Sequence, residues 1–226
     1  MEKIRDLLDP SKTNLKVVED KKKGIYIAGV TENYVAEAGE VYEIMKIGNE
    51  NRSIGSTDMN AESSRSHSCF ILTVQMNNTA DFSSKTGKLY LVDLAGSEKI
   101  SKTGAAGQTL EEAKTINKSL TTLGIVINNL TDGKSTHIPY RDSKLTRVLQ
   151  ESLGGNARTA LIITCSPAKF NEDETISTLK FGSRAKKIKN KPKVNKELTV
   201  AELSHMVDAK DREIAMLKKR VKALEL

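Results

Sequence analysis

The sequence predicts an α/β domain built around one sheet, followed by a separate C-terminal helix. Three observations support this prediction. Runs with strand character intermix with runs of helical periodicity between residues 15 and 189. A basic stretch that contains Pro192 then interrupts the pattern. From residue 200 onward, apolar residues recur in steps of three and four, which is the spacing of a coiled-coil helix.

The first part of the domain starts with an apolar-periodic segment over residues 2–8, which ends at a turn signal around Pro10. Two strand candidates follow, joined by a lysine-rich tip, and this order predicts a hairpin. Helical spacing then continues until Gly48, and a polar loop comes after it. The predicted elements are strands over 15–18 and 24–30, a helix over 35–49 and a loop over 51–68.

The second part of the domain begins with two strands that should pair in antiparallel fashion. A long amphipathic helix and a shorter helix follow, and the apolar run after them is typical of an interior strand. One more helix closes the domain. The predicted elements are strands over 69–75 and 88–92, helices over 111–130 and 143–153, a strand over 160–165 and a helix over 175–189.

The C-terminal helix carries apolar residues close to four heptads long, with Lys210 as the polar residue in the seam. Two interpretations fit this pattern. The helix could fold onto the domain as a single amphipathic element, or it could pair with a second copy in a two-stranded coiled coil. The basic linker before it and the charged residues around the seam favour the coiled coil, and therefore a homodimer through 200–226.

The charge balance favours a negatively charged partner. The 226 residues include 36 Lys and Arg against 29 Asp and Glu, for a net charge of +7. Aromatic residues make up only 4%, with no Trp, and no row of aromatics is available to stack on bases. We therefore expect an acidic protein surface as the partner, and no nucleic acid.

Membrane insertion and secretion are not expected. The chain has no apolar run long enough to cross a membrane, and its N-terminus lacks a signal-peptide core. Cys69 and Cys165 each lie in an apolar run, which predicts buried thiols in a reducing compartment. The expected location is cytoplasmic, with no membrane partner.

A first chemical motif follows the strand over 88–92, where Asp93-Leu-Ala-Gly96-Ser-Glu98 begins. A carboxylate at the end of a strand can hold Mg²⁺ through its water shell. A glycine three residues later lets a backbone amide approach a γ-phosphate without a side chain in the way. An ordinary Asp-started turn would explain Asp93 and Gly96 taken alone.

A second motif, Asn60-Ala-Glu-Ser63-Ser64-Arg65-Ser66-His67, enters the strand over 69–75. Its hydroxyls could complete a Mg²⁺ shell and contact phosphate oxygens or an attacking water. Because this loop precedes the Asp93 motif by one hairpin, the two could meet at the same edge of the sheet.

Together the two motifs resemble switch I and switch II of kinesin motor domains, at every defining position. Myosin differs around the corresponding glycine. The resemblance covers nearly the whole chain and extends through Lys102-Thr-Gly104, Ile116-Asn-Lys-Ser-Leu120, His137-Ile-Pro-Tyr-Arg-Asp-Ser-Lys-Leu145 and Leu153-Gly-Gly-Asn156.

The resemblance implies a partial kinesin-type P-loop NTPase motor domain over residues 1–189, with a central mixed sheet flanked by helices. It further implies a neck linker over 190–199 and a neck coiled coil over 200–226. The implied activity is that of an ATP-driven, microtubule-based motor, and the implied location is the microtubule cytoskeleton.

For the chemistry, the resemblance implies that Ser64 ligates Mg²⁺ and that Asp93 holds the metal through water. It implies that Asn60 and Ser63 contact phosphate or the lytic water and that Gly96 senses the γ-phosphate of ATP. Arg65 and Glu98 would form the ion pair that closes the two switches. The alternative for that pair is a surface salt bridge that contributes little.

Kinesins also present basic loops to the acidic surface of tubulin. The resemblance implies three such segments here, in the hairpin tip, after switch II and around the shorter helix. Their attraction to the microtubule should weaken with salt. The expected residues are Lys21, Lys22, Lys23, Lys99, Lys102, His137, Tyr140, Arg141, Lys144 and Arg147.

No Gly-x-x-x-x-Gly-Lys-Ser/Thr run occurs in the sequence. We therefore expect that the chain begins inside the motor domain and that, alone, it binds ATP weakly. A rival hypothesis is a non-motor module that binds microtubules and dimerises without ATPase activity.

Overall fold

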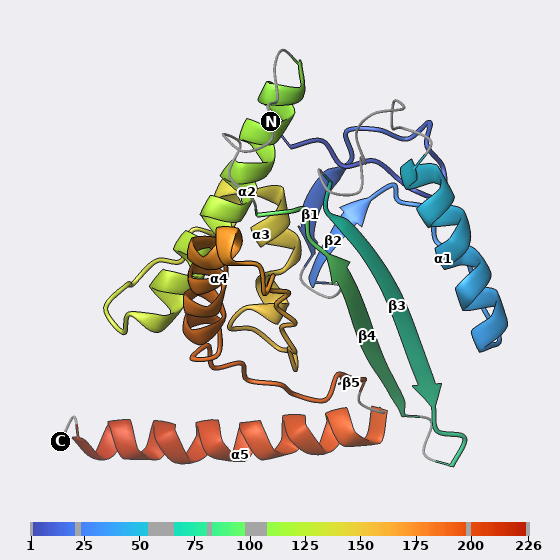
Figure 1. The fold of residues 1–226 in the computed structure, drawn as a ribbon. Coiled ribbons are helices and arrows are strands. Elements are labelled where there is room, and N and C mark those ends of the chain that lie inside the picture. Colours follow the sequence, from blue (N-terminus) through green and yellow to red (C-terminus); the bar gives the residue numbers. More distant parts are fainter. Residues whose placement is uncertain are drawn as a thin grey trace. The chain divides into compact units, whose positions relative to one another are not determined.

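The computed structural model describes residues 2–20, 24–53, 66–80, 83–97, 108–197 and 200–224. The chain divides into two compact units. One comprises Met1–Phe70 and Val92–Lys193, and the other comprises Ile71–Leu91 and Val194–Leu226. Figure 1 shows the helices and strands of both units.

The first unit contains the predicted hairpin. Strand β1 (Lys16–Asp20) pairs antiparallel with β2 (Gly24–Ala28), and Val18 lies opposite Tyr26. Gly24 begins β2 with a φ of 71°, a value that glycine adopts without steric cost. The hairpin prediction is therefore confirmed, while its tip at 21–23 lies outside the described residues.

The N-terminal segment forms a compact loop and not the periodic element that its apolar pattern suggested. Buried Asp6 accepts hydrogen bonds from the amides of Thr31 (2.6 Å), Leu8 (2.8 Å) and Asp9 (3.3 Å). A side chain that takes up neighbouring amides competes with helix formation. Burial acts to raise the pKa of Asp6, but the hydrogen bonds from Thr31, Leu8 and Asp9 outweigh it and leave the pKa below its usual value.

Helix α1 (Ala38–Ser53) runs past Gly48, which the sequence suggested as its end. The extra turn has partners in the N-terminal segment. The side-chain amide of Asn51 donates to the carbonyl of Leu7 at 2.8 Å, and the Arg5 guanidinium donates to the carbonyl of Asn51 at 3.4 Å. These contacts satisfy polar groups of the last turn, so the helix continues.

Helices α2 (Gln108–Thr131), α3 (Lys144–Val148) and α4 (Glu172–Ala185) pack together in the first unit (Figure 1). Their core consists of apolar side chains from α2 and from the residue that follows α3. The predicted helices over 111–130 and 175–189 are confirmed, each shifted by a few residues. The buried core residues here are Leu123, Val126, Ile127 and Leu149.

The predicted helix over 143–153 is broken into a short α3 and two 3₁₀ helices, η3 (Tyr140–Asp142) and η4 (Gln150–Ser152). Ser143 caps α3, because its hydroxyl accepts from the amides of Leu145 and Thr146. Fully buried Thr146 donates its hydroxyl to the Tyr140 carbonyl at 2.8 Å. A third 3₁₀ helix, η5 (Lys169–Asn171), precedes α4.

The strand predicted over 160–165 is wrong. These residues have no regular structure, and Ile162 is 87% exposed. A strand requires a neighbour with which to exchange hydrogen bonds, and no described strand pairs with this run. Ile163 instead lies against α4, since a Cβ on Gly182 would come within 2.9 Å of the Ile163 Cδ1. Cys69 and Cys165 are exposed, so the prediction of buried thiols is also wrong.

The second unit contains most of a sheet with the strand order β3-β4-β5. Its strands are β3 (Ser68–Asn77), β4 (Ser84–Asp93) and β5 (Lys196–Glu197), so the two strands predicted over 69–75 and 88–92 form and are neighbours. Strand β5 pairs antiparallel with β4, with Ser84 opposite Glu197. The apolar side chains of Val74, Met76 and Leu89 are exposed.

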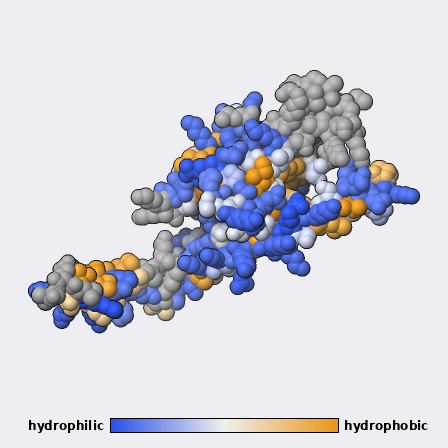
Figure 2. Space-filling model, turned by 90° about the vertical axis from the view of Figure 1, so that its left-hand side faces the viewer, coloured by the Kyte–Doolittle hydropathy of each residue, from blue (hydrophilic) through white to orange (hydrophobic). Residues whose placement is uncertain are grey.

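Helix α5 (Val200–Leu224) follows in the second unit, where the sequence predicts a helix. Large apolar side chains described in this helix are exposed, including Leu203, Val207, Ile214, Leu217 and Val221. Figure 2 shows hydrophobic residues, in orange, at the surface among hydrophilic residues, in blue. No described helix combines the length and apolar character needed to cross a bilayer.

Candidate functional site

The Asp93 motif lies where β4 ends, and residues 94–97 continue without regular structure. The Asp93 Oδ2 is 2.7 Å from the Arg52 Nη1 of helix α1. The Arg52 side chain is 10% exposed and that of Asp93 is 70% exposed. The pair therefore joins a buried cation to a carboxylate that still faces solvent, so the carboxylate remains open to a second partner.

Arg52 also holds the end of the second motif. Its Nε donates to the Ser66 hydroxyl at 3.2 Å, and its Nη2 donates to the Ser66 carbonyl at 2.8 Å. One guanidinium therefore links the residue before His67 to the carboxylate at the end of β4. Guanidinium groups are suited to this because their donors are fixed in one plane.

His67 makes a second link between the two motifs. Its Nδ1 accepts from the amide of buried Ala95 at 3.0 Å, and its Nε2 is 2.7 Å from the hydroxyl of buried Ser119 in α2. Burial lowers the pKa of His67, with a further lowering by Arg52, against the opposing effects of Glu2 and Asp93. The ring is therefore neutral near pH 7, with a lone pair on Nδ1 and a proton on Nε2.

The structure thus brings the end of the motif over 60–67 to the start of the motif over 93–98. Asp93 and Gly96 are described, while Asn60, Ser63, Ser64, Arg65 and Glu98 lie outside the described residues. Their proposed roles stay predictions. Sequence reasoning missed Arg52 and Ser119, because a basic residue in the last turn of a helix and a serine within a helix are ordinary features.

The residues present fit a Mg²⁺ ion held through water. A single exposed carboxylate at a strand end offers the oxygen chemistry that Mg²⁺ prefers, and it leaves room for the waters that this ion retains. Among the described residues, no group of three or more His, Cys, Asp and Glu side chains could surround a metal directly. The role of Asp93 in holding the metal through water stays a prediction.

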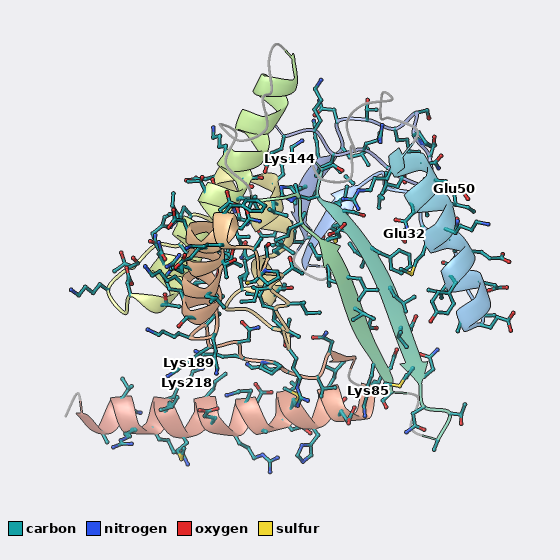
Figure 3. All side chains as sticks on the ribbon, in the orientation of Figure 1. Glu32, Glu50, Lys85, Lys144, Lys189 and Lys218 are labelled. Carbon is teal, nitrogen blue, oxygen red and sulfur yellow. The ribbon has the colours of Figure 1, made fainter. Side chains whose placement is uncertain are left out.

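The basic residues around α3 are engaged by the hairpin and the N-terminal segment. The Glu19 carboxylate of β1 pairs with Arg141 at 3.3 Å and also with Arg147. The hydrogen bond and charge of Arg147, aided by those of Arg141, lower the pKa of Glu19. The Lys144 ammonium, labelled in Figure 3, donates to the Leu15 carbonyl at 3.2 Å.

These contacts order the basic groups without covering all of them. The Arg141 side chain stays 78% exposed, and His137 is exposed. Tyr140 is half-buried, and its hydroxyl donates to the Leu153 carbonyl at 2.5 Å. The sequence did not predict that Glu19 pairs with Arg141 and Arg147, because these partners are distant along the chain. Lys99 and Lys102 lie outside the described residues, as do Lys21, Lys22 and Lys23.

Asn190, which follows α4, is fixed by the loop after η4. Its Oδ1 accepts from the Gly154 amide at 2.6 Å, and its Nδ2 donates to the Ser152 carbonyl at 3.1 Å and to the Thr159 hydroxyl at 3.0 Å. Gly154 has a φ of 90°, and a Cβ there would lie 2.9 Å from the Leu130 Cδ2. The positive φ favours glycine here, and a side chain would also press on the Leu130 side chain of α2.

Comparison with known proteins places the chain in a family of α/β nucleotide-hydrolysing motors. The family model described as the kinesin motor domain matches residues 1–188, and the chain belongs to this family. The predicted fold class is confirmed, because solved structures that resemble the chain are kinesin motor domains.

Two relatives and two solved structures illustrate the similarity. Kinesin-related protein 3 of Dictyostelium discoideum is 64% identical over 225 residues, covering 100% of this chain and 19% of that protein. The kinesin heavy chain of Drosophila melanogaster is 57% identical over 226 residues, covering 100% of this chain and 23% of that protein. The structure of a fast kinesin has 63% identity and a TM-score of 0.78, over 88% of this chain and 56% of that one.

The second structure is that of a KIF14 dimer with AMP-PNP in complex with a microtubule. It has 40% identity and a TM-score of 0.81, over 91% of this chain and 60% of that one. The chain spans between 19% and 26% of the length of the curated kinesins that it matches.

Proposed function

We propose that this chain forms the switch, track-binding and neck portion of a microtubule motor that hydrolyses ATP. The observation that carries the proposal is the linkage of the two kinesin-like motifs by Arg52 and His67. The end of the first motif and the start of the second lie together in the fold, an arrangement that suits two nucleotide-sensing loops. Membership of the kinesin motor domain family supports the same conclusion.

In the proposed site, Asp93 holds Mg²⁺ through water, Ser64 ligates it, and Gly96 offers its amide to the γ-phosphate. Asn60 and Ser63 contact phosphate or the lytic water, and Arg65 pairs with Glu98 to close the site. Mg²⁺ would neutralise charge that develops on the phosphate oxygens. Arg52 orients the Asp93 carboxylate, because its guanidinium lies 2.7 Å from Oδ2.

The partner of the basic surface is proposed to be tubulin. The surface comprises His137, Tyr140, Arg141, Lys144 and Arg147, together with Lys21, Lys22, Lys23, Lys99 and Lys102 in segments outside the described residues. Exposed Arg141, steadied by Glu19, offers a planar guanidinium to carboxylates of an acidic protein. The protein is then expected in the cytoplasm, on microtubules.

The chain is proposed to divide into a motor portion, a neck linker that transmits movement, and a neck helix that pairs two motors in a dimer. The motor portion is assigned to 1–189, the neck linker to 190–199 and the neck coiled coil to 200–226. The exposed apolar residues of α5 support homodimerisation, since two such helices could cover each other.

The test is co-sedimentation of this chain, and of the full-length protein that carries it, with microtubules in AMP-PNP or ADP. The full-length protein should bind more tightly with AMP-PNP and hydrolyse ATP faster with microtubules. The chain should bind in a salt-sensitive manner without responding to nucleotide. Nucleotide-dependent release of the chain alone would contradict our expectation that it binds ATP weakly.

A matched pair of charge-removing variants tests the binding surface. Arg141→Ala should weaken microtubule binding of the full-length protein by about two- to fivefold, the size expected for one exposed charge. Lys180→Ala removes the same charge from an exposed position on α4 and should change binding less. Equal effects of the two variants would mean that net charge, and not this surface, governs binding.

A further inference from the structure

The ring of His67 joins three separate segments of the first unit. His67 directly precedes β3, Ala95 follows β4, and Ser119 lies in the middle of α2. The ring accepts from the Ala95 amide at 3.0 Å and lies 2.7 Å from the Ser119 hydroxyl. A rigid aromatic ring with one nitrogen on each partner fixes the distance between them, which a flexible side chain would not do.

The two partners differ in what they can do. The Ala95 amide can only donate, so it requires the lone pair of Nδ1, and the ring proton then belongs to Nε2. Ala95 and Ser119 are both buried, which makes water a poor substitute for either hydrogen bond. Ala95 is also the residue before Gly96. A displacement of the Ala95 amide must therefore move the ring, break its bond to Nδ1, or carry Ser119 and α2 with it, and the Gly96 amide is in the next peptide unit of the chain.

The link made by Arg52 is of a different kind. Its donors reach Ser66 and Asp93, which belong to the two motifs. His67 reaches the backbone beside Gly96 on one side and a side chain of α2 on the other. The histidine ring thus connects the segment after β4 to α2, the helix that packs on α3 and α4.

We propose that His67 is a positioning residue that couples the position of the Gly96 amide to helix α2 through Ser119. The inference rests on the proposed function, because Gly96 has a phosphate to sense only in a nucleotide-binding motor. It assigns His67 and Ser119 a joint role in communication between the nucleotide site and α2, and neither residue contacts the nucleotide in this assignment.

The test compares Ser119→Ala with Ser119→Thr in the full-length protein. Loss of the hydroxyl should lower microtubule-stimulated turnover about three- to tenfold, the effect expected for one buried hydrogen bond, with a smaller change in basal turnover. Ser119→Thr keeps a hydroxyl on the same carbon and should restore stimulation. A merely structural role would lower the Tm and both turnover rates together, so Tm is measured alongside.

His67→Asn provides an independent variant. The Asn Oδ1 can accept from the Ala95 amide in place of Nδ1, but its shorter side chain cannot reach Ser119. It should therefore reproduce the Ser119→Ala phenotype, and the double variant should be no worse than either single one, since both remove the same link. This comparison also holds if Ser119→Ala lowers the Tm.

The outcomes separate the two proposals. A wild-type protein without microtubule-stimulated turnover would overturn the proposed function, and this inference with it. A stimulated wild-type protein in which Ser119→Ala and His67→Asn both keep full stimulation would overturn the inference alone. Additive losses in the double variant would do the same, because they would show that the two residues act separately.

Discussion

Helices α2 and α5 are nearly equal in length, with 24 and 25 residues, yet their apolar faces have opposite fates. Val126 of α2 is 0% exposed, whereas Ile214 of α5 is 48% exposed. Both helices carry apolar residues in steps of three and four. The difference comes from their neighbours, since α2 packs on α3 and α4, while no apolar side chain described in α5 is buried.

Periodicity in the sequence identifies an apolar face of a helix but not what covers that face. For α2 the cover lies in the same unit of the chain, and burial of its face stabilises the fold. For α5 a second chain is the proposed cover. Variants at matched positions can therefore test the difference between the two helices.

The largest effect is expected for Ile127→Ala in α2. Ile127 is 2% exposed, so truncation removes buried methyl groups and leaves a cavity. The free energy of unfolding should fall by about 2–5 kcal/mol. Urea unfolding of the chain, followed by circular dichroism, measures this. A loss below about 1 kcal/mol would show that the α2 face is not the core described here.

A second effect concerns the residues that cover α2. Thr146→Val keeps the shape of a fully buried side chain but removes the hydroxyl that donates to the Tyr140 carbonyl. The carbonyl of half-buried Tyr140 would lose this partner, at a cost of about 1 kcal/mol. Thr146→Ser keeps the hydroxyl and serves as the control. If the valine variant unfolds at the same urea concentration as wild type, this hydrogen bond does not stabilise the cover.

Acid should weaken the α2-containing unit through Asp6. Because hydrogen bonds lower the pKa of this carboxyl below 3.8, its stabilising contribution is complete above about pH 4 and is lost as pH falls through the folded-state pKa. Asp6→Asn should cost about 1–2 kcal/mol at pH 7 and flatten the acid limb of the stability curve. An acid limb as steep as that of wild type would assign the pH dependence to other groups.

The smallest effect on folding is expected for Ile214→Ala in α5, the counterpart of Ile127→Ala. In dilute solution the free energy of unfolding should change by less than about 0.5 kcal/mol, because half of the side chain already contacts solvent and Ala is a good helix former. At high concentration the variant should associate less, as sedimentation equilibrium can measure. A large loss of stability in the dilute monomer would mean that α5 is covered within its own chain.

The hairpin and the long helices could be predicted from sequence because local patterns determine them. Helix α2, strand β4 and helix α5 all form where periodicity or alternation indicates them. The prediction of a strand over 160–165 was wrong for a physical reason. An apolar segment becomes a strand only where another strand offers hydrogen bonds. Cys165 was assigned a buried environment by the same reasoning and is exposed.

The candidate site was predictable only in part. Asp93 and Gly96 follow from a motif, because their chemistry depends on short spacing. Arg52 and Ser119 could not be found in that way, since each acquires its role from contacts 41 and 52 residues distant along the chain. Glu19 is similar, because Arg147 lies 128 residues away from it. Such partners are determined by tertiary packing alone.

The three hydrogen bonds of the Asn190 side chain depend on its amide group, so deamidation of this residue would disturb them. Deamidation would replace the Nδ2 donor with an oxygen that faces the Ser152 carbonyl at 3.1 Å, and attraction would become repulsion. The Thr159 hydroxyl could adapt by donating instead, but the carbonyl could not. The segment that leaves α4 would then lose part of its hold on the Gly154 loop without any change in side-chain size.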